Sequence, residues 1–197
     1  MMFDIIFSLV VLVILSPLYI FFSLLILLLD GFPIFFKQKR VGKNGHLFNV
    51  YKFRSMVKNA EDTLKNDKDL YQKYINNDYK LDPSEDPRIL PIGNFIRKAS
   101  IDELPQFFNV VKGDMSVVGP RPVVPSELND LYGDKSIIYT SVKPGITGLW
   151  QASGRSELKG EDRVKLDIEG IQKKSFLFDI YIILKTIHVV FTKRGAH

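Results

Sequence analysis

The most pronounced pattern in the chain is an uninterrupted apolar run near its N-terminus. Residues Ile5 to Leu29, 25 in all, carry no charge, and Asp4 and Asp30 flank them. A straight helix of that length measures roughly 37 Å, which exceeds the ~30 Å hydrocarbon core of a bilayer. No basic residues precede the run and no small-residue cleavage site follows it, which argues against a cleaved signal peptide. The run therefore predicts a membrane-inserted helix.

A serine and a proline interrupt this run at its middle. Pro17 has no N–H for the carbonyl of Val13, and the hydroxyl of Ser16 is expected to bond back to Leu12. This predicts a bend, which leaves two topologies: a kinked helix that crosses the membrane, and a re-entrant helix with both ends on one side. The basic run from Lys37 to Lys43 places the C-terminal side in the cytoplasm. The N-terminal flank has no Lys or Arg, so the positive-inside rule does not distinguish the two topologies.

Alternating apolar and polar residues follow the apolar run. Strands are expected near residues 34–41 and 47–53, joined by Asn44-Gly45, a dipeptide typical of a type I′ hairpin turn. Lys52 and Arg54 stand at the exit of the second strand. They are either phosphate-binding cations or a solvated strand end.

Two further segments have helical patterns. Residues 56–75 predict a polar surface helix, in which Asp67 and Asp69 have the spacing of the metal-binding Asp-x-Asp motif of some nucleotide-sugar transferases. A helix so rich in Lys and Asp produces this spacing readily by chance. Residues 176–191 are strongly apolar but too few for a span. An interfacial helix and a buried core helix both remain open for them.

An acid pair, Asp102-Glu103, opens another apolar segment. Ser100 and Glu103 match a capping box. A helix that starts at Asp102 fits Pro105 better, because the missing N–H of a proline in the first turn is no loss. We therefore expect Asp102 at a helix N-terminus, where the partial positive charge stabilises an ionised carboxylate and attracts phosphate. Simple helix capping is the alternative.

Other candidate anion-binding residues lie in loops. Arg88 follows Asp86-Pro87, and Arg121 is held between Pro120 and Pro122, which suits bidentate phosphate recognition. A structural arginine in a turn is the alternative for Arg121. Residues 143–155 form a glycine-punctuated loop that carries Gln151 and Arg155, and they do not match a phosphate-binding P-loop.

Composition narrows the classes of function. A chain of 197 residues predicts one domain. The net charge of +5 is too low for a nucleic-acid-binding domain and suits anionic lipid or a nucleotide. The chain has no cysteine and only three histidines, far apart in sequence, so disulfides and thiolate metal sites are excluded and zinc is not expected.

The motifs together resemble the bacterial sugar transferase family, the monotopic polyprenyl-phosphate phosphoglycosyl transferases. They run in the family order over nearly the whole chain: Phe3-Asp4, Ser16-Pro17, Gln38-x-Arg40-x-Gly42, Lys52-Phe53-Arg54-Ser55-Met56, Asp86-Pro87-Arg88, Asp102-Glu103-Leu104-Pro105-Gln106, residues 113–122, Pro144-Gly145-Ile146-Thr147-Gly148, Gln151 and Gly154-Arg155.

The resemblance implies an enzyme that transfers sugar-1-phosphate from a UDP-sugar to undecaprenyl phosphate, with release of UMP. This is the initiating step of surface glycan synthesis. It implies that Asp102 is the nucleophile of a covalent phosphosugar intermediate and that Asp102 and Glu103 hold Mg²⁺. The phosphate or nucleotide would be bound by Arg88, Arg121, Lys52, Arg54, Gln151 and Arg155. The late segment from Asp179 resembles the hexose-1-phosphate branch, which favours UDP-glucose or UDP-galactose.

The expected architecture follows from the pattern and the resemblance together. It is an α+β fold, mostly helical, with a membrane-embedded re-entrant helix broken at Ser16 and Pro17 (residues 1–33). A catalytic domain (residues 34–197) contains a small β-hairpin and amphipathic interfacial helices at the cytoplasmic face of the bacterial inner membrane. Larger members carry further N-terminal helices, and the chain is either a short form or one catalytic region. A homodimer and the glycan pathway are left open.

Two other functions fit fewer motifs. One is a membrane-associated glycosyltransferase that uses Asp67 and Asp69 and releases UDP. The other is a non-catalytic membrane scaffold with a basic lipid-binding face.

Overall fold

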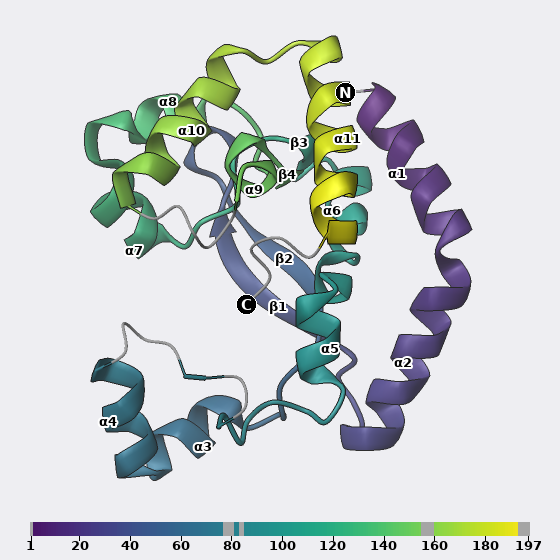
Figure 1. Cartoon of the computed structure of the whole chain (residues 1–197), viewed down its shortest axis with the longest axis vertical. Helices are drawn as coiled ribbons and strands as arrows, with labels where there is room; N and C mark the ends of the chain where they lie inside the picture. The colour runs from purple at the N-terminus through teal and green to yellow at the C-terminus, as the bar shows by residue number, and fades with distance from the viewer. Residues whose placement is uncertain (1, 77–80, 83–84, 155–159, 193–197) are drawn as a thin grey trace.

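The computed structural model describes residues 2–76, 81–82, 85–154 and 160–192 (Figure 1). The α-helices are α1 (Met2–Ile14), α2 (Ser16–Asp30), α3 (Ala60–Asn66), α4 (Lys68–Asn76), α5 (Gly93–Lys98), α6 (Gln106–Lys112), α7 (Pro125–Glu127), α8 (Ser136–Thr140), α9 (Leu149–Ala152), α10 (Gly160–Gln172) and α11 (Phe176–Thr192). Short turns of other helix types are η1 (Lys43–Gly45), η2 (Ile101–Glu103), η3 (Leu128–Tyr132) and η4 (Gly133–Lys135). The strands are β1 (Phe35–Val41), β2 (Leu47–Phe53), β3 (Ser116–Val118) and β4 (Gly145–Thr147). The prediction of a mostly helical α+β fold is confirmed.

The N-terminal apolar run forms two helices, α1 and α2, which meet at a bend of 62°. The hydroxyl of Ser16 donates to the carbonyl of Val13 at 2.8 Å, one residue later than the predicted acceptor, Leu12. Val13 is the carbonyl that Pro17 leaves without its helical partner, since proline has no N–H. The hydroxyl therefore takes the place of the missing backbone donor and stabilises the break.

Only α1 and α2 taken together meet the length and apolarity of a membrane span, and no single helix in the described part of the chain does so. Both outer ends of the pair are bonded to the rest of the protein. Asp4 Oδ1 accepts from the hydroxyl of Ser116 at 3.1 Å and from the N–H of Val117 at 3.3 Å. At the other end, the Arg54 guanidinium donates to the carbonyl of Asp30 at 3.0 Å and pairs with its carboxylate at 3.0 Å. The pair therefore lies along one side of the molecule (Figure 1).

The predicted hairpin is present as the antiparallel pair β1–β2, in which Phe35 faces Phe53 and Val41 faces Leu47. Asn44 and Gly45 have φ angles of 56° and 77°, and the N–H of His46 bonds the carbonyl of Lys43 at 3.2 Å. This is the type I′ geometry, in which both central residues have positive φ.

A second, parallel pair of strands joins β3 to β4, where the sequence indicated only a glycine-punctuated loop. The backbones approach so closely that a Cβ on Gly145 would lie 2.1 Å from the nitrogen of Gly119. A Cβ on Gly119 would lie 2.5 Å from the carbonyl oxygen of Lys143. Glycine is therefore needed at both positions. The pairing brings the Gly-Pro-Arg motif beside the Pro-Gly-Ile-Thr-Gly motif.

Three apolar clusters form the core of the described part of the chain. The first lies between the hairpin, α6, β3 and α11 and includes Phe48, Val110, Met115 and Ile182. The second joins α2 to the hairpin and α5 through Tyr19, Phe22, Ile26, Phe53 and Ile96. The third lies between η3, α8 and α10 and includes Val123, Tyr132, Tyr139 and Val164.

The polar segment 56–75 is not one helix, as predicted, but two, α3 and α4. The carboxylate of Asp67 accepts the N–H of Leu70 at 2.9 Å, which is the bond of an N-cap residue. Asp67 therefore separates the two helices because its side chain offers the backbone a cap for α4. Helix capping therefore explains Asp67, one of the two residues of the Asp-x-Asp motif, without a metal.

Candidate active site

The acid pair lies in the turn η2, between α5 and α6. The prediction that Asp102 begins a helix is wrong: α6 begins at Gln106, with Pro105 as its N-cap residue. The N–H groups of Glu103 and Leu104 instead bond the carbonyls three residues back, at 3.2 and 3.1 Å. The chain enters this turn through Ser100, which has a φ of 57°. The tight turn places both carboxylates before the helix.

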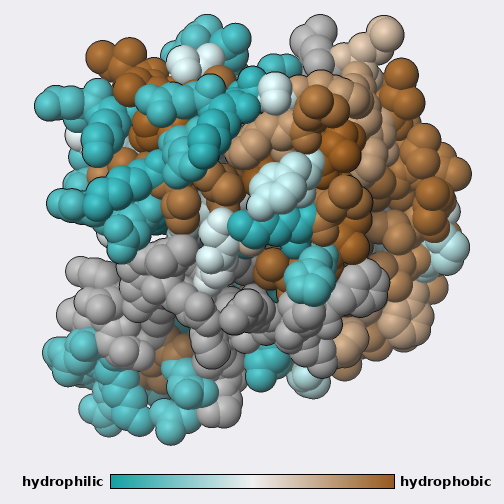
Figure 2. All heavy atoms as spheres, turned by 45° about the horizontal axis from the view of Figure 1, so that its top comes forward, coloured by the Kyte–Doolittle hydropathy of each residue, from teal (hydrophilic) through white to brown (hydrophobic). Residues whose placement is uncertain are grey.

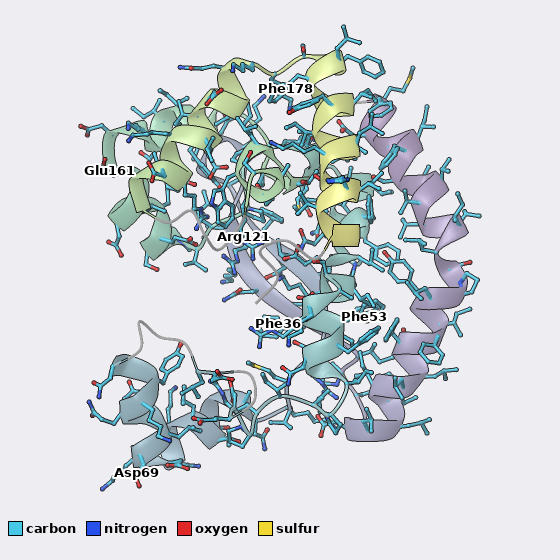
Figure 3. The ribbon with its side chains drawn as sticks, in the orientation of Figure 1. Phe36, Phe53, Asp69, Arg121, Glu161 and Phe178 are labelled. Carbon is cyan, nitrogen blue, oxygen red and sulfur yellow. The ribbon has the colours of Figure 1, made fainter. Side chains whose placement is uncertain are left out.

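Two cations approach the pair from other elements. The Lys52 ammonium, from β2, lies 3.3 Å from Asp102 Oδ2 and 2.9 Å from Glu103 Oε1. The Arg121 guanidinium, from the loop after β3, lies 3.1 Å from Glu103 Oε1. Arg121 is seen at the centre of Figure 3, beside the hairpin. Two carboxylates and two cations, about 50 and 18 residues apart along the chain, thus form one cluster.

Burial dominates the electrostatics of Asp102, whose exposed fraction is 9%. Burial raises the pKa of this carboxyl above its ordinary value and Glu103 raises it further, while Lys52 and Arg121 act in the opposite direction. The sequence predicted the reverse, an ionised carboxylate favoured by a helix N-terminus. A three-residue turn lacks the aligned peptide dipoles of a long helix. Lys52 and Arg121 are therefore the groups that oppose the effect of burial on the pKa of Asp102.

The turn is supported by a contact from α2. The Tyr19 hydroxyl, on α2, donates to the carbonyl of Leu104 at 2.5 Å, and the N–H of Phe107 bonds the same carbonyl at 3.0 Å. Tyr19 packs its ring against Phe53 at 5.5 Å between centroids. The residue after the acid pair is thus held by both α6 and α2.

Helix α6 is fixed to β2 by Asn109, which is fully buried. Its amide donates to the carbonyl of Asn49 at 2.7 Å and accepts the N–H of Tyr51 at 3.0 Å. The side chain thereby completes two bonds at the free edge of β2, much as a neighbouring strand would. The sequence offered no signal for this role, because its partners are backbone groups about 60 positions away.

Arg54 and Arg88 have other partners. Arg54 is buried at the end of α2, with its second bond to the carbonyl of Gly31 at 2.7 Å. Arg88 forms two bonds of 2.8 Å to the carboxylate of Asp86 and lies 5.4 Å from the ring centre of Tyr74. Among the described residues, the cluster around the acid pair receives Lys52 and Arg121 but no direct contact from these two arginines. Their binding of substrate stays a prediction.

Gln151 and Arg155 complete the predicted set. Gln151, on α9, is buried, and its amide has no hydrogen-bond partner within the described part of the chain. Such a group costs free energy unless a ligand or water satisfies it. Arg155 lies outside the described residues.

A second buried carboxylate, Asp167 on α10, is a core group. Burial raises its pKa to about 6. Its Oδ2 accepts the hydroxyl of Tyr132 at 2.5 Å and lies 3.8 Å from Arg163. Asp167 is bonded to Tyr132, a member of the apolar cluster of η3, α8 and α10, and does not touch the acid pair in the described structure.

No group of three or more acidic or histidine side chains suitable for a metal occurs among residues 2–76, 81–82, 85–154 and 160–192. Asp102 and Glu103 nevertheless offer carboxylate oxygens on one turn. Mg²⁺ is commonly bound by one or two carboxylates together with substrate phosphates and water. The donor set of the pair therefore fits Mg²⁺ carried in with a phosphorylated substrate.

A model of the family "Bacterial sugar transferase" matches residues 1–193. The chain belongs to this family. The family prediction made from the motifs is thus confirmed. The acid pair, Lys52 and Arg121, which form the cluster described above, all belong to these motifs.

Several curated relatives match nearly the whole chain. The undecaprenyl-phosphate galactose phosphotransferase of Salmonella typhimurium is 46% identical over 99% of this chain and 41% of its own length. The exopolysaccharide production protein ExoY of Rhizobium meliloti is 39% identical over 99% of this chain and 86% of its own length. The UDP-glucose:undecaprenyl-phosphate glucose-1-phosphate transferase of Escherichia coli is 38% identical over 98% of this chain and 40% of its own length. The chain thus spans about two fifths of two of these relatives.

Proposed function

We propose that this sugar transferase moves sugar-1-phosphate from a UDP-sugar to undecaprenyl phosphate, the first step in building a surface glycan such as exopolysaccharide, capsule or O-antigen. The observation that carries the proposal is the pair Asp102-Glu103, on a turn that α2 contacts. Lys52 bridges the two carboxylates and Arg121 pairs with Glu103. The names of the Salmonella and Escherichia coli relatives support the lipid acceptor and favour glucose or galactose as the sugar.

In the first step, an Asp102 oxygen attacks the β-phosphorus of the UDP-sugar. The bond between that phosphorus and the oxygen bridging to the α-phosphate breaks, UMP leaves with the electron pair, and a phosphosugar-aspartyl group forms. Asp102 is the nucleophile in this scheme because its carboxylate is the more buried of the pair, with side-chain exposures of 13% against 20% for Glu103. Burial leaves a carboxylate poorly solvated and therefore more reactive once it is ionised.

In the second step, an oxygen of undecaprenyl phosphate attacks the same phosphorus. The bond to Asp102 breaks, the carboxylate is regenerated, and undecaprenyl-diphosphate-sugar is released. Glu103 holds Arg121 and Lys52 in place through both steps.

The charges of the site explain the need for further positive charge. Two carboxylates and two cations cancel, so the diphosphate of the donor brings negative charge that these residues do not balance. Asp102 and Glu103 are the residues that would hold Mg²⁺, which would neutralise the diphosphate and polarise its phosphoryl oxygens. Lys52 and Arg121 orient the donor, and Arg54, Arg88, Gln151 and Arg155 remain candidates for contacts with its nucleotide.

The membrane arrangement belongs to the same proposal: α1 and α2 form a re-entrant helix pair, and the catalytic domain lies on the cytoplasmic face of the bacterial inner membrane. Both ends of the pair are bonded to one body, Asp4 to β3 and Asp30 to Arg54, which supports a re-entrant pair with both ends on one side. The basic run from Lys37 places that body in the cytoplasm.

An exposed apolar surface supports this placement. It is formed by side chains of α1, α2 and α11, and we call it the apolar belt: Ile6, Leu9, Val10, Val13, Ile14, Ile20, Phe21, Leu24, Leu28, Leu29, Phe176, Leu177, Tyr181, Leu184 and Ile187. The rings of Phe3 and Phe176 meet at 5.2 Å, so α1 and α11 are adjacent. Figure 2 shows hydrophobic atoms gathered on this side and hydrophilic atoms on the other. A patch this large is typical of membrane contact, with α11 lying in the interface.

The test is a reaction of purified protein with undecaprenyl phosphate, Mg²⁺ and a panel of UDP-sugars, in which the released nucleotide is identified. UMP is expected, together with a protein adduct of hexose phosphate, visible by intact mass when the lipid is omitted. Asp102→Asn should lower UMP release at least a thousandfold and abolish the adduct, since an amide does not replace the nucleophile.

Asp179→Asn is the matched control, because it makes the same chemical change at a partly buried carboxyl of α11 outside the pair. It should retain activity. Release of UDP, or normal turnover by Asp102→Asn, would refute the proposed reaction.

A further inference from the structure

The loop that carries Arg121 is held by its carbonyl groups. The carbonyl of Arg121 accepts the hydroxyl of Tyr139 at 2.7 Å, and that of Pro122 accepts Arg40 Nη1 at 3.1 Å. The carbonyl of Val123 accepts the N–H of Val41 at 2.9 Å. Three consecutive carbonyls are thus bonded to two other elements, β1 and α8.

The sequence explains why carbonyls serve as the anchors. Pro120 and Pro122 have no N–H to donate, so Arg121 offers the one backbone donor among these three residues and their carbonyls outnumber their donors. The N–H of Val123, the next one available, bonds the oxygen of Tyr139 at 3.3 Å. Tyr139 therefore contacts the segment on both sides of Pro122, once as a donor and once as an acceptor.

We propose that Tyr139 and Arg40 are positioning residues for Arg121 in the sugar-phosphate transfer. Neither touches the acid pair in the described structure. They fix the backbone from which the Arg121 side chain, one-third exposed, reaches Glu103 at 3.1 Å. The inference rests on the proposed function, because it takes Arg121 as a residue that orients the donor phosphate.

Arg40 is itself held in place for this role. Its Nη2 donates to Gln38 Oε1 at 2.6 Å, from the same face of β1, and its Nη1 lies 3.7 Å from the carboxylate of Glu127. Burial and the nearby charge of Arg121 lower the pKa of Arg40, and Glu127 acts against them. The catalytic scheme gives no role to the Gln-x-Arg motif of β1. In this proposal the motif supports the loop that carries Arg121.

Tyr139 is held from behind by Tyr132. Their ring centres are 4.6 Å apart, both side chains are almost fully buried, and the hydroxyl of Tyr132 is bonded to Asp167. Tyr139→Phe keeps the ring in this packing and removes only the hydroxyl that reaches the loop. Tyr132→Phe makes the same change one ring further away, where no bond to residues 121–123 is lost.

The experiment is a double-mutant cycle between Tyr139→Phe and Arg121→Ala, with UDP-galactose and UDP-glucose as donors. Misplacing a catalytic group by about 1 Å costs up to ~100-fold in rate, so Tyr139→Phe is expected to lower kcat/KM for the donor about tenfold. In the Arg121→Ala background the same change should have an effect of less than about twofold, because the group that it positions is gone. The KM for undecaprenyl phosphate should not change.

Tyr132→Phe is the matched control and should lower thermal stability without any effect on kcat/KM that depends on Arg121. Arg40→Gln, run through the same cycle, removes the bond to Pro122 and leaves the two rings untouched. If Tyr139→Phe does not fold, the cycle with Arg40→Gln tests the positioning inference in its place.

An equal effect of Tyr139→Phe in both backgrounds, or none in either, overturns the inference. A native kcat/KM in Arg121→Ala has a different meaning: it removes Arg121 from donor binding and so overturns that part of the proposed function together with the inference. Loss of UMP formation in Asp102→Asn tests the reaction itself and is independent of both.

Discussion

Lys52 places one ammonium group between the carboxylates of two adjacent residues, and this arrangement gives the site its pH dependence. Burial raises the pKa of Asp102, and Lys52 is the largest influence that lowers it. The proposed nucleophile must be ionised, so the first step requires a pH above that pKa. Lys52 would therefore lower the pH at which the proposed nucleophile becomes ionised.

We predict that Lys52→Met shifts the acid limb of the pH profile to higher pH. Without the ammonium the pKa of Asp102 rises further, so less of the carboxylate is ionised at neutral pH, and UMP release at pH 7 should fall about tenfold to a hundredfold. Part of the loss should be recovered at pH 9. The measurement is the initial rate of UMP release against pH.

Lys52→Arg keeps the charge and should keep the position of the acid limb, although the geometry differs. An acid limb that does not move in Lys52→Met would show that Lys52 has no influence on the pKa of the nucleophile.

Individual residues also show where sequence alone falls short. Lys52, Arg54, Arg88 and Arg121 all read as phosphate-binding cations, yet the fold gives the first and last to the acid pair and gives Arg54 a helix end. Arg88 has Asp86 two residues away, a neighbour visible in the sequence and a sufficient partner. The partner of Arg54 could not be predicted in this way. Asp30 is distant from Arg54 in the sequence and lies beside it only in the folded structure.

At the scale of elements, local signals predicted well and long-range pairing did not. Asn44-Gly45 defines its own turn, so the hairpin could be located to within a residue or two at each end. Ser16 and Pro17 break a helix by chemistry confined to one turn, and the bend was expected there. The pairing of β3 with β4 joins, through backbone bonds, segments about 30 residues apart in the sequence. Strands of three residues are too short to show an alternating pattern from which they could be predicted.

We predict that the break between α1 and α2 determines the topology. The chain has no cysteine, so single cysteines introduced as Met2→Cys and Lys43→Cys can be labelled without background. Both should react with a membrane-impermeant maleimide from the cytoplasmic side only. Ser16→Ala combined with Pro17→Leu restores an N–H for the carbonyl of Val13, which favours a straight helix long enough to span. The cysteine at position 2 should then become accessible from the periplasmic side.

Labelling of position 2 from the periplasmic side in the native sequence would refute the re-entrant arrangement. Retention of cytoplasmic labelling after the double change would instead assign the topology to the contacts of Asp4 with β3.

At the scale of the whole molecule, the apolar belt would determine how the active site meets the proposed lipid substrate. Helix α11 packs Ile182 into the core and leaves Leu177 and Leu184 exposed at 79% and 62%. The core-helix alternative therefore holds for one face of α11, and the interfacial alternative stays a prediction for the exposed apolar face. Helix α11 contacts α1 through Phe176 and Phe3, so the proposed membrane surface would include both elements.

We predict that Leu177→Ser with Leu184→Ser impairs the second step more than the first. Each leucine withdrawn from the lipid costs about 2 kcal/mol of burial, while α1 and α2 still hold the protein to the membrane. In vesicles, kcat/KM for undecaprenyl phosphate should fall about tenfold, with formation of the hexose-phosphate adduct unchanged. The measurement compares steady-state rates with single-turnover rates of adduct formation, in vesicles of phosphatidylethanolamine and phosphatidylglycerol. This comparison separates the effect on the second step from the effect on the first.

Ile137→Ser is the control, since Ile137 is 78% exposed on α8, across the molecule from the helix pair (Figure 1). Equal losses in the two variants would argue that α11 does not contact lipid.

The hydroxyl of Tyr19 joins α2 to the carbonyl of Leu104, one residue from the acid pair. In the proposed membrane arrangement, the lateral pressure of the bilayer would act on the reaction centre itself, because a tilt of α2 would also pull on the turn that bears the proposed nucleophile. The catalytic rate would then depend on lipid chain length and temperature. A cell that remodels its lipids as it cools would tune the start of glycan synthesis with no separate regulator.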